Sequence, residues 1–284
     1  MSIVVTGATG HLGRHVVEQL LEKVPADRIT AVVRDAAKAA GLADRGVRIA
    51  VADYDTPATF DGLFAAGDKV LLISGNEVGK NRVDQHRVVI DAARAAGVAL
   101  LAYTSAPGSL TAALVDDHRA TEAVILESGV PHVLLRNGWY HENYTENLAA
   151  VLEHGAVVAA AGDGRVASAS RADYAAAAVA VLTGEGHENK TYELSGDQAW
   201  SLAEYAAELS RQTGRQIAYT PVSVEAYQEI LTGAGLPGPL AASLASADAS
   251  IEKGELAVCT GDLSRLTGRP TTPLAEAVAA ALKD

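Results

Sequence analysis

Short apolar runs of strand length alternate with longer segments that carry helical apolar periodicity over the first two thirds of the chain. The first run, 3–5, precedes a segment in which Val16, Val17 and Leu20 recur on one helical face. Later strand-length runs lie at 29–34, 47–52, 69–73, 100–105, 133–136 and 192–195, and helical patterns at 82–96, 116–127 and 174–182. Strands that alternate with helices predict a parallel sheet with right-handed crossovers. We therefore expect an α/β fold built on a doubly wound parallel sheet.

Three glycines, Gly7, Gly10 and Gly13, occupy the turn between the first strand and the first helix. Gly7 suits a tight turn, Gly10 lets the backbone approach a pyrophosphate, and Gly13 lets the helix pack close to the strand. The helix N-terminus that follows favours a negative charge. Three glycines in seven residues can also be only a flexible turn, but the strand before them and the helix after them favour a dinucleotide-binding loop.

The end of the second predicted strand bears on which dinucleotide binds. Arg34 lies 21 positions after Gly13, and Lys38 follows at a distance of one helical turn. An acidic residue near this position is typical of NAD sites, whereas an arginine accommodates the 2′-phosphate of NADP. Asp35 is acidic and adjacent, but a guanidinium at the strand end can bind phosphate bidentately. We therefore predict NADP; a solvated arginine at a strand end is the alternative.

Polar residues also follow the next three strands. Asp53 can accept a hydrogen bond from the adenine amino group, with Tyr54 beside it, or it can bond the backbone of a turn or cap a helix. Small residues at 74–76 let a ribose or phosphate pass close, or form a plain loop. Ser105 ends the fifth strand. Because ligands bind beyond the carboxyl ends of strands in such sheets, these positions predict one shared binding edge.

The segment after the sixth strand, 137–144, contains three aromatic residues, His141 and two asparagines. Rings stack on planar groups and amides orient a carboxamide, so the segment suits a nicotinamide and a flat substrate; core packing is the alternative. Arg165, in a later tight turn, either reaches a phosphate or is solvated.

The helix predicted over 116–127 lacks the Tyr-x-x-x-Lys pair of short-chain dehydrogenases. His118 and Glu122 stand at that spacing. They are neighbours on one helix face, either as an acid–base pair or as an exposed helix pair. We expect no metal site, because a third ligand is missing.

Composition narrows the class of protein. The 284 residues are 49% hydrophobic, which is enough for a large core, and the formal net charge of −12 disfavours nucleic acid and anionic membrane as partners. The single cysteine, Cys259, permits no intrachain disulfide. We see no signal peptide and no apolar run of membrane-spanning length.

The pattern changes near position 196. Ser201 and Glu204 form a capping box before a helix that ends near 213, and Thr272-Pro273 starts a last helix. Asp173 is expected to N-cap the alanine-rich helix at 174–182, and the glycines and prolines of 233–239 to break the chain. We predict a Rossmann domain over 1–195 and a smaller, mostly helical C-terminal substrate domain over 196–284, with part of 140–170 contributing to the substrate side.

On these residues the chain resembles the NmrA-like atypical short-chain dehydrogenase/reductases, and within them the bacterial NADPH-dependent quinone reductases. The most specific matches are Arg-Asn-Gly-Trp-Tyr at 136–140 and Arg-Ala-Asp-Tyr-Ala at 171–175. Further matching segments are 6–10, 12–13, 33–34, 52–54, 71–74, 102–105, 134–135, 142–144, 161–164, 169 and 176–178. The loop at 106–109, which borders the substrate, is shorter than the family pattern.

The resemblance implies a cytoplasmic enzyme that holds a quinone against the nicotinamide of NADPH. It implies that the cofactor is bound by Gly7, Ala8, Thr9, Gly10, His11 and Leu12, by Arg34, by Ser74, Gly75 and Asn76, and by Arg136, Asn137, Gly138, Trp139, Tyr140 and His141.

The missing Tyr-Lys pair favours direct hydride transfer to a quinone, because a delocalised hydroquinone anion needs only hydrogen-bond donors and later a proton from water. Asn137, Tyr140 or Asn143 is expected to donate to the quinone oxygen. Two alternatives stay open: an NADP-sensing regulatory protein without turnover, and a reductase of another flat conjugated acceptor such as a triphenylmethane dye. We expect a monomer or homodimer.

Overall fold

The computed structural model describes residues 2–75, 81–112 and 115–283, and the chain divides into two compact units. The first unit comprises Met1–Ala106, Asp117–Asn137 and Arg171–Tyr192. The second unit comprises Pro107–Asp116, Gly138–Ser170 and Glu193–Asp284. The two units are therefore interleaved along the chain instead of following one another at position 195, and all of 138–170 belongs to the second unit.

The first unit is built on a seven-stranded sheet in the order β3-β2-β1-β4-β5-β6-β9. Its strands are β1 (Ile3–Val5), β2 (Ile29–Val33), β3 (Arg48–Val51), β4 (Lys69–Leu72), β5 (Leu100–Ser105), β6 (His132–Asn137) and β9 (Lys190–Leu194). The strands from β3 to β6 pair in parallel; Ile3, for example, is in register with Ile29 and with Lys69. The strand order reverses between β1 and β4, and such a switch point is where doubly wound sheets bind ligands. The predicted fold class is confirmed.

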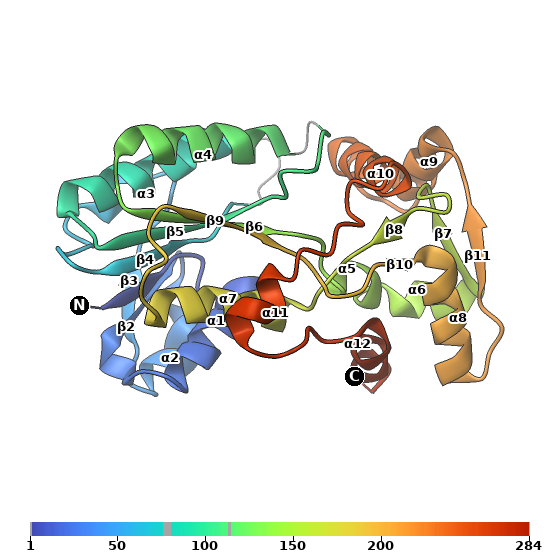
Figure 1. Cartoon of the computed structure of the whole chain (residues 1–284), viewed down its shortest axis with the longest axis horizontal. Helices are drawn as coiled ribbons and strands as arrows, with labels where there is room; N and C mark the ends of the chain where they lie inside the picture. Colours follow the sequence, from blue (N-terminus) through green and yellow to red (C-terminus); the bar gives the residue numbers. More distant parts are fainter. Residues whose placement is uncertain (1, 76–80, 113–114, 284) are drawn as a thin grey trace. The chain divides into compact units, whose positions relative to one another are not determined.

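Helices cover both faces of this sheet: α3 and α4 lie on one face and α1 and α7 on the other (Figure 1). The helices are α1 (His11–Leu21), α2 (Ala40–Ala43), α3 (Arg82–Ala96), α4 (Asp116–Ser128) and α7 (Arg171–Thr183), with 3-10 turns η1 (Ala26–Arg28), η2 (Ala36–Ala39) and η3 (Pro57–Phe60). One core cluster joins Val89 and Ile90 of α3 and Ile125 of α4 to Leu101 of β5, all of them fully buried. These apolar positions fix the face that each helix turns to the sheet.

The second unit contains two small sheets, in which β10 pairs with β8 and β11 with β7, and several helices. Its elements are α5 (Glu142–Thr145), α6 (Leu148–His154), β7 (Ala156–Ala159), β8 (Arg165–Val166), β10 (Trp200–Ser201), α8 (Leu202–Thr213), β11 (Ala218–Pro221), α9 (Val224–Gly233), α10 (Gly238–Glu252), α11 (Asp262–Thr267) and α12 (Leu274–Ala281). The capping box at the start of α8 has both of its hydrogen bonds. No helix in the described part of the chain is long and apolar enough to cross a membrane.

Two local predictions were wrong and one was right. Asp173 lies inside the first turn of α7, which begins two residues earlier, so it is not the N-cap. Pro273 is itself the N-cap of α12, where the sequence predicted Thr272 as the cap and Pro273 as the first helical residue. The predicted break at 233–239 is present, since α9 ends at Gly233 and α10 begins at Gly238; Pro239 falls in the first turn of α10, where no intrahelical N–H bond is lost.

Candidate cofactor and active site

The glycine loop between β1 and α1 is closed so tightly that two of its glycines cannot be replaced without strain. Gly7 has a φ of 60°, and its carbonyl accepts a 2.9 Å hydrogen bond from Gly10 N–H. A Cβ on Gly13 would lie 2.2 Å from the Gly7 oxygen and 2.8 Å from the Ala8 Cα. The absence of that Cβ is what lets α1 start directly against the loop.

The N-terminus of helix α1 directly follows the glycine loop. Gly10 is the N-cap and has no side-chain cap bond, and the first turn holds no acidic residue. The helix dipole favours an anion at this end. A pyrophosphate fits both the charge of this N-terminus and the closeness of its backbone.

Tyr54, predicted to lie beside an adenine, bonds the sheet edge through its hydroxyl. The hydroxyl donates to Thr6 Oγ1 at 2.5 Å and lies 3.0 Å from the Ile73 carbonyl, and Ile73 N–H donates to Thr6 Oγ1 at 3.1 Å. Burial raises the pKa of Tyr54 well above its usual value. The phenol therefore ties together the carboxyl ends of β1, β3 and β4.

The acidic residue next to Arg34 is committed to the backbone. Asp35 N-caps η2, with its carboxylate accepting a 2.9 Å hydrogen bond from Ala37 N–H. Arg34 and Lys38 are both exposed at the end of β2. The turn η2 begins at Ala36, where the sequence analysis expected a helix to start if Lys38 is to approach the same 2′-phosphate as Arg34. Asp53 Oδ1 similarly accepts a 3.0 Å hydrogen bond from Asp55 N–H, so the predicted backbone role in a turn is present there.

The loop after β4 is held by a buried histidine that the sequence analysis missed. Gly75 N–H donates to His86 Nε2 at 3.0 Å, and Ser74 N–H donates to Thr104 Oγ1 at 2.9 Å. His86, fully buried on α3, lies 2.9 Å from Thr121 Oγ1 through Nδ1. Since Nε2 accepts, Nδ1 carries the proton. Asn76, also predicted to bind the cofactor, lies outside the described residues.

His86 remains neutral over the physiological pH range. Burial, together with nearby His118 and Arg82, lowers its pKa to about 3. The neutral ring is the form that can accept from Gly75, so the loop anchor persists at neutral pH.

Ser105 and Arg136, predicted at the ends of β5 and β6, meet on Glu122. Ser105 Oγ donates to Glu122 Oε1 at 2.6 Å, and the Arg136 guanidinium bonds the same carboxylate twice, at 2.9 and 2.6 Å. The Glu122 side chain is only 9% exposed and that of Arg136 is 27% exposed. The carboxylate therefore fixes the guanidinium and the hydroxyl at the edge of the sheet.

His118 and Glu122 have different partners. His118 Nδ1 lies 2.9 Å from the Tyr103 hydroxyl and Nε2 lies 3.5 Å from Arg82. Burial, with Arg82 adding to it, lowers the pKa of His118 to about 4. The two residues are thus neither a bonded acid–base pair nor an exposed surface pair.

The segment after β6 opens the second unit. Gly138 N–H donates to the Leu194 carbonyl at 2.8 Å. Asn137, the last residue of β6, is buried, with 7% of its surface exposed. The next side chains are half-buried, namely those of Trp139, Tyr140 and Asn143. These are the residues that the sequence assigned to a nicotinamide and a flat substrate.

His141 bonds protein groups through both ring nitrogens. Nε2 donates to the Thr272 carbonyl at 2.8 Å, so Nδ1, 2.8 Å from Ser168 Oγ, accepts in the neutral ring. Trp200 Nε1–H donates to the same Ser168 oxygen at 3.0 Å. The His141 side chain thus anchors the segment, and its backbone N–H is also engaged, donating to the Ala169 carbonyl at 3.0 Å.

Arg165, the other predicted phosphate ligand, is exposed at the start of β8. Its guanidinium donates to the Ala199 carbonyl at 2.6 Å and to the Glu204 carboxylate at 2.8 Å. These two bonds orient it toward the N-terminus of α8, and we leave it out of the proposed cofactor set.

A sequence model of the family described as NAD(P)H-binding matches residues 7–185. The chain is 49% identical to quinone oxidoreductase 2 of Escherichia coli over 97% of both chains. The crystal structure of that protein complexed with NADPH superposes with a TM-score of 0.95 over 99% of both chains. The Citrobacter triphenylmethane reductase complexed with NADP(H) gives a TM-score of 0.94 at 43% identity, over 99% of this chain and all of that one. An NmrA-like family oxidoreductase of Aspergillus flavus is 29% identical over 98% of this chain and 94% of its own length.

Proposed function

Because the chain belongs to the NAD(P)H-binding family, we propose that it is an oxidoreductase that transfers a hydride from NADPH to a quinone. The observation that carries the proposal is the glycine loop and uncapped N-terminus of α1, followed at the next strand end by Arg34 with its acidic neighbour turned to the backbone. The likeness to the E. coli quinone oxidoreductase supports the acceptor class.

The cofactor fits the described groups one by one. The first-turn N–H groups of α1 would bind the pyrophosphate, and Arg34 with Lys38 would bind the 2′-phosphate. The loop at Ser74 and Gly75 would lie along the ribose and phosphates. Asn137, Gly138, Trp139 and Tyr140 would orient the nicotinamide.

The chemistry supplied by bound NADPH is a hydride, that is, two electrons and one proton. A quinone that accepts the hydride on its conjugated ring system becomes a hydroquinone monoanion, and one proton from water completes the hydroquinone. The residues of this chain therefore position the quinone against the nicotinamide and polarise its acceptor oxygen. Asn137, Tyr140 or Asn143 would donate to the acceptor oxygen on which charge develops.

The edge of the sheet supports a mechanism without an internal proton donor. The Tyr-x-x-x-Lys spacing is occupied by His118 and Glu122, and Glu122 is held by Ser105 and Arg136. A carbonyl reductase must protonate an alkoxide as it forms, whereas a delocalised hydroquinone anion takes its proton later. The cluster is therefore proposed to support the nicotinamide end of the site, with Arg136 and Ser105 kept in place by the carboxylate.

A steady-state assay tests the proposal: NADPH oxidation at 340 nm should depend on added quinone and saturate with it. Asn143→Ala and Tyr140→Phe should lower kcat with little change in the KM for NADPH. NADPH binding without oxidation by any quinone would instead support an NADP-sensing regulatory protein.

A second candidate acceptor class rests on the likeness to the Citrobacter triphenylmethane reductase. Such dyes are also flat and conjugated, so the same stacking residues would serve them. Comparing kcat/KM for quinones and dyes under one set of conditions decides between the two acceptor classes.

A further inference from the structure

A cavity of about 250 Å³ lies in the second unit, and the chain reaches it from three neighbouring strand ends. Pro107 lies two residues beyond β5, Gly138 directly follows β6, and Leu194 ends β9. At the start of the two strands, Asn189 N–H donates to the His132 carbonyl, and at their end Gly138 N–H donates to the Leu194 carbonyl. The strands β6 and β9 therefore run in the same direction. The lining also includes Glu193, Ser195, Glu255, Leu256, Val258 and Thr260.

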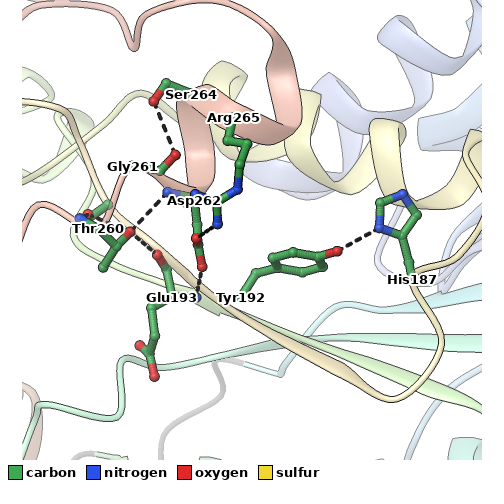
Figure 2. A network of polar contacts seen from close by, with 9 residues as sticks. His187, Tyr192, Glu193, Thr260, Gly261, Asp262, Ser264 and Arg265 are labelled. Atoms are coloured by element: carbon green, nitrogen blue, oxygen red, sulfur yellow. Dashed lines mark hydrogen bonds and ion pairs between the residues drawn. The ribbon is translucent and has the colours of Figure 1, made fainter.

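One wall of the cavity is fixed by a polar network (Figure 2). Thr260 N–H donates to Ser195 Oγ at 3.0 Å, and the Thr260 hydroxyl donates to the Glu193 carbonyl. Glu193 N–H donates to Asp262 Oδ2 at 3.0 Å, and Asp262 in turn pairs with Arg265. The segment that contributes Thr260 is therefore tied to the end of β9, and the cavity has a preformed wall.

Two half-buried carboxylates, Glu193 and Glu255, line the cavity and bond the loop that follows β5. Glu193 Oε2 accepts from Gly108 N–H at 3.1 Å. Glu255 accepts from Thr111 N–H at 2.9 Å and from the Thr111 hydroxyl, and these bonds hold its pKa below the usual range. The carboxylates thus fasten the loop at 107–111 and bring negative charge to the cavity.

The remaining lining is apolar or neutral. Leu194 and Leu256 are buried, Val258 is 54% exposed, and none of the described residues that line the cavity is basic. Lys253 acts on Glu255 from outside the lining. The cavity volume of about 250 Å³ lies just below the usual range for ligand pockets, which begins at about 300 Å³. It suits an acceptor of one or two rings.

We propose that this cavity receives the hydride acceptor, and that Glu193 and Glu255 make it select uncharged or cationic acceptors over anionic ones. The inference deepens the proposed function and rests on it. Its basis is the placement of the cavity beyond the carboxyl ends of β5, β6 and β9, where ligands of such sheets bind. An anionic group within a few ångströms of an ionised carboxylate in a partly dry cavity is repelled far more strongly than in water.

Glu255→Gln tests the charge without removing the contacts. The glutamine oxygen accepts from Thr111 N–H and its amide donates to the Thr111 hydroxyl, so the loop keeps both bonds. With menadione as the neutral acceptor and a naphthoquinone sulfonate as the anionic one, the ratio of kcat/KM values, anionic over neutral, should rise about fivefold in the variant. The comparison between proteins cancels the intrinsic reactivity of each quinone.

Two further variants are measured, one as a control and one with an added positive charge. Glu229→Gln removes the same charge from an exposed position on α9 outside the lining and should leave the ratio unchanged. Val258→Lys adds a positive charge at an exposed lining position and should raise the ratio at least as much as Glu255→Gln. Added salt should reduce the difference between wild type and variants.

The outcomes separate the two proposals. Wild-type turnover of menadione with an anionic-to-neutral ratio that neither Glu255→Gln nor Val258→Lys changes would overturn the acceptor cavity and leave the proposed function standing. Absence of turnover with either quinone would overturn both.

Discussion

The imidazole of His86 accepts a 3.0 Å hydrogen bond from the backbone N–H of Gly75. This bond joins the interior of α3 to the loop that we propose lies along the ribose and phosphates of the cofactor. The ring is neutral, with its other nitrogen 2.9 Å from Thr121 Oγ1. His86 is fully buried and is therefore a positioning residue that sets where the loop backbone stands.

Replacing His86 by leucine should weaken cofactor binding. The loss of one buried acceptor leaves Gly75 N–H unpaired, and we expect the KM for NADPH to rise about fivefold or more while the KM for quinone stays within twofold. His86→Gln, which offers an oxygen near the Nε2 position, should restore most of the affinity. Equal KM values for NADPH in the leucine, glutamine and wild-type proteins would contradict the assigned role.

Arg34→Ala should change the preference between the two dinucleotides. A charge-assisted hydrogen bond to phosphate contributes about 1.5–3 kcal/mol, so the KM for NADPH should rise at least about tenfold while that for NADH changes little. Arg94→Ala, which removes an exposed arginine from the last turn of α3, serves as the matched control and should alter neither. An equal rise in the KM values for NADPH and NADH would argue against recognition of the 2′-phosphate by Arg34.

Gly13→Ala should destabilise the first unit as well as the cofactor loop. The new Cβ would stand 2.2 Å from the Gly7 oxygen, and backbone atoms are the obstacle, so the helix or the loop must move. We expect a loss of about 3 kcal/mol or more in the free energy of unfolding, measured by urea titration. Gly41→Ala, at a position where a Cβ meets nothing within 4 Å, should cost far less.

Asp248 predicts a pH dependence of stability in the second unit. This α10 residue is 9% exposed and accepts a 2.8 Å hydrogen bond from Ala160 N–H, and burial raises its pKa from 3.8 to about 6. Because the folded state holds the proton more tightly than the unfolded state, the stabilising contribution is fully present below pH 3.8 and is lost as pH rises through about 6.

Asp248→Asn should remove that dependence. Asparagine keeps an oxygen for Ala160 N–H and cannot ionise, so the variant should be more stable than wild type above pH 6, by up to about 3 kcal/mol. Urea unfolding of both proteins at pH values from 4 to 8 measures the difference. A stability gap that does not grow between pH 4 and 6 would show that the carboxyl titrates normally.

The features that sequence predicted well are those whose signal is local. The glycine turn, the strand ends and the capping box of Ser201 and Glu204 each lie within a few residues, and β5 and α3 fall where the pattern placed them. The pairing of Glu122 with Arg136 joins residues on α4 and β6, and helix periodicity suggested His118 as the partner instead. Only the sheet order brings the two together.

His86 was missed for a related reason. On α3 it reads as one polar residue in an amphipathic helix, and its role depends on Gly75 and Thr121, which come from other elements. Helix α10 was missed because glycine and proline at 237–239 are typical of a chain break; Pro237 is its N-cap and Pro239 stands in its first turn, where a proline is tolerated. Short polar signals thus marked the strand ends from sequence alone, whereas the contacts that support them required the fold.

The interleaving of the two units constrains how this chain can be taken apart. The backbone passes from one unit to the other after Ala106, Asp116, Asn137, Ser170 and Tyr192. A truncation at any single point therefore leaves at least one unit missing part of its own chain, so neither unit can be expressed as a contiguous fragment or exchanged as a cassette. Exchange of any single contiguous segment that spans a crossing therefore replaces parts of both units at once, so the second unit can be altered alone only by changes within its own three segments.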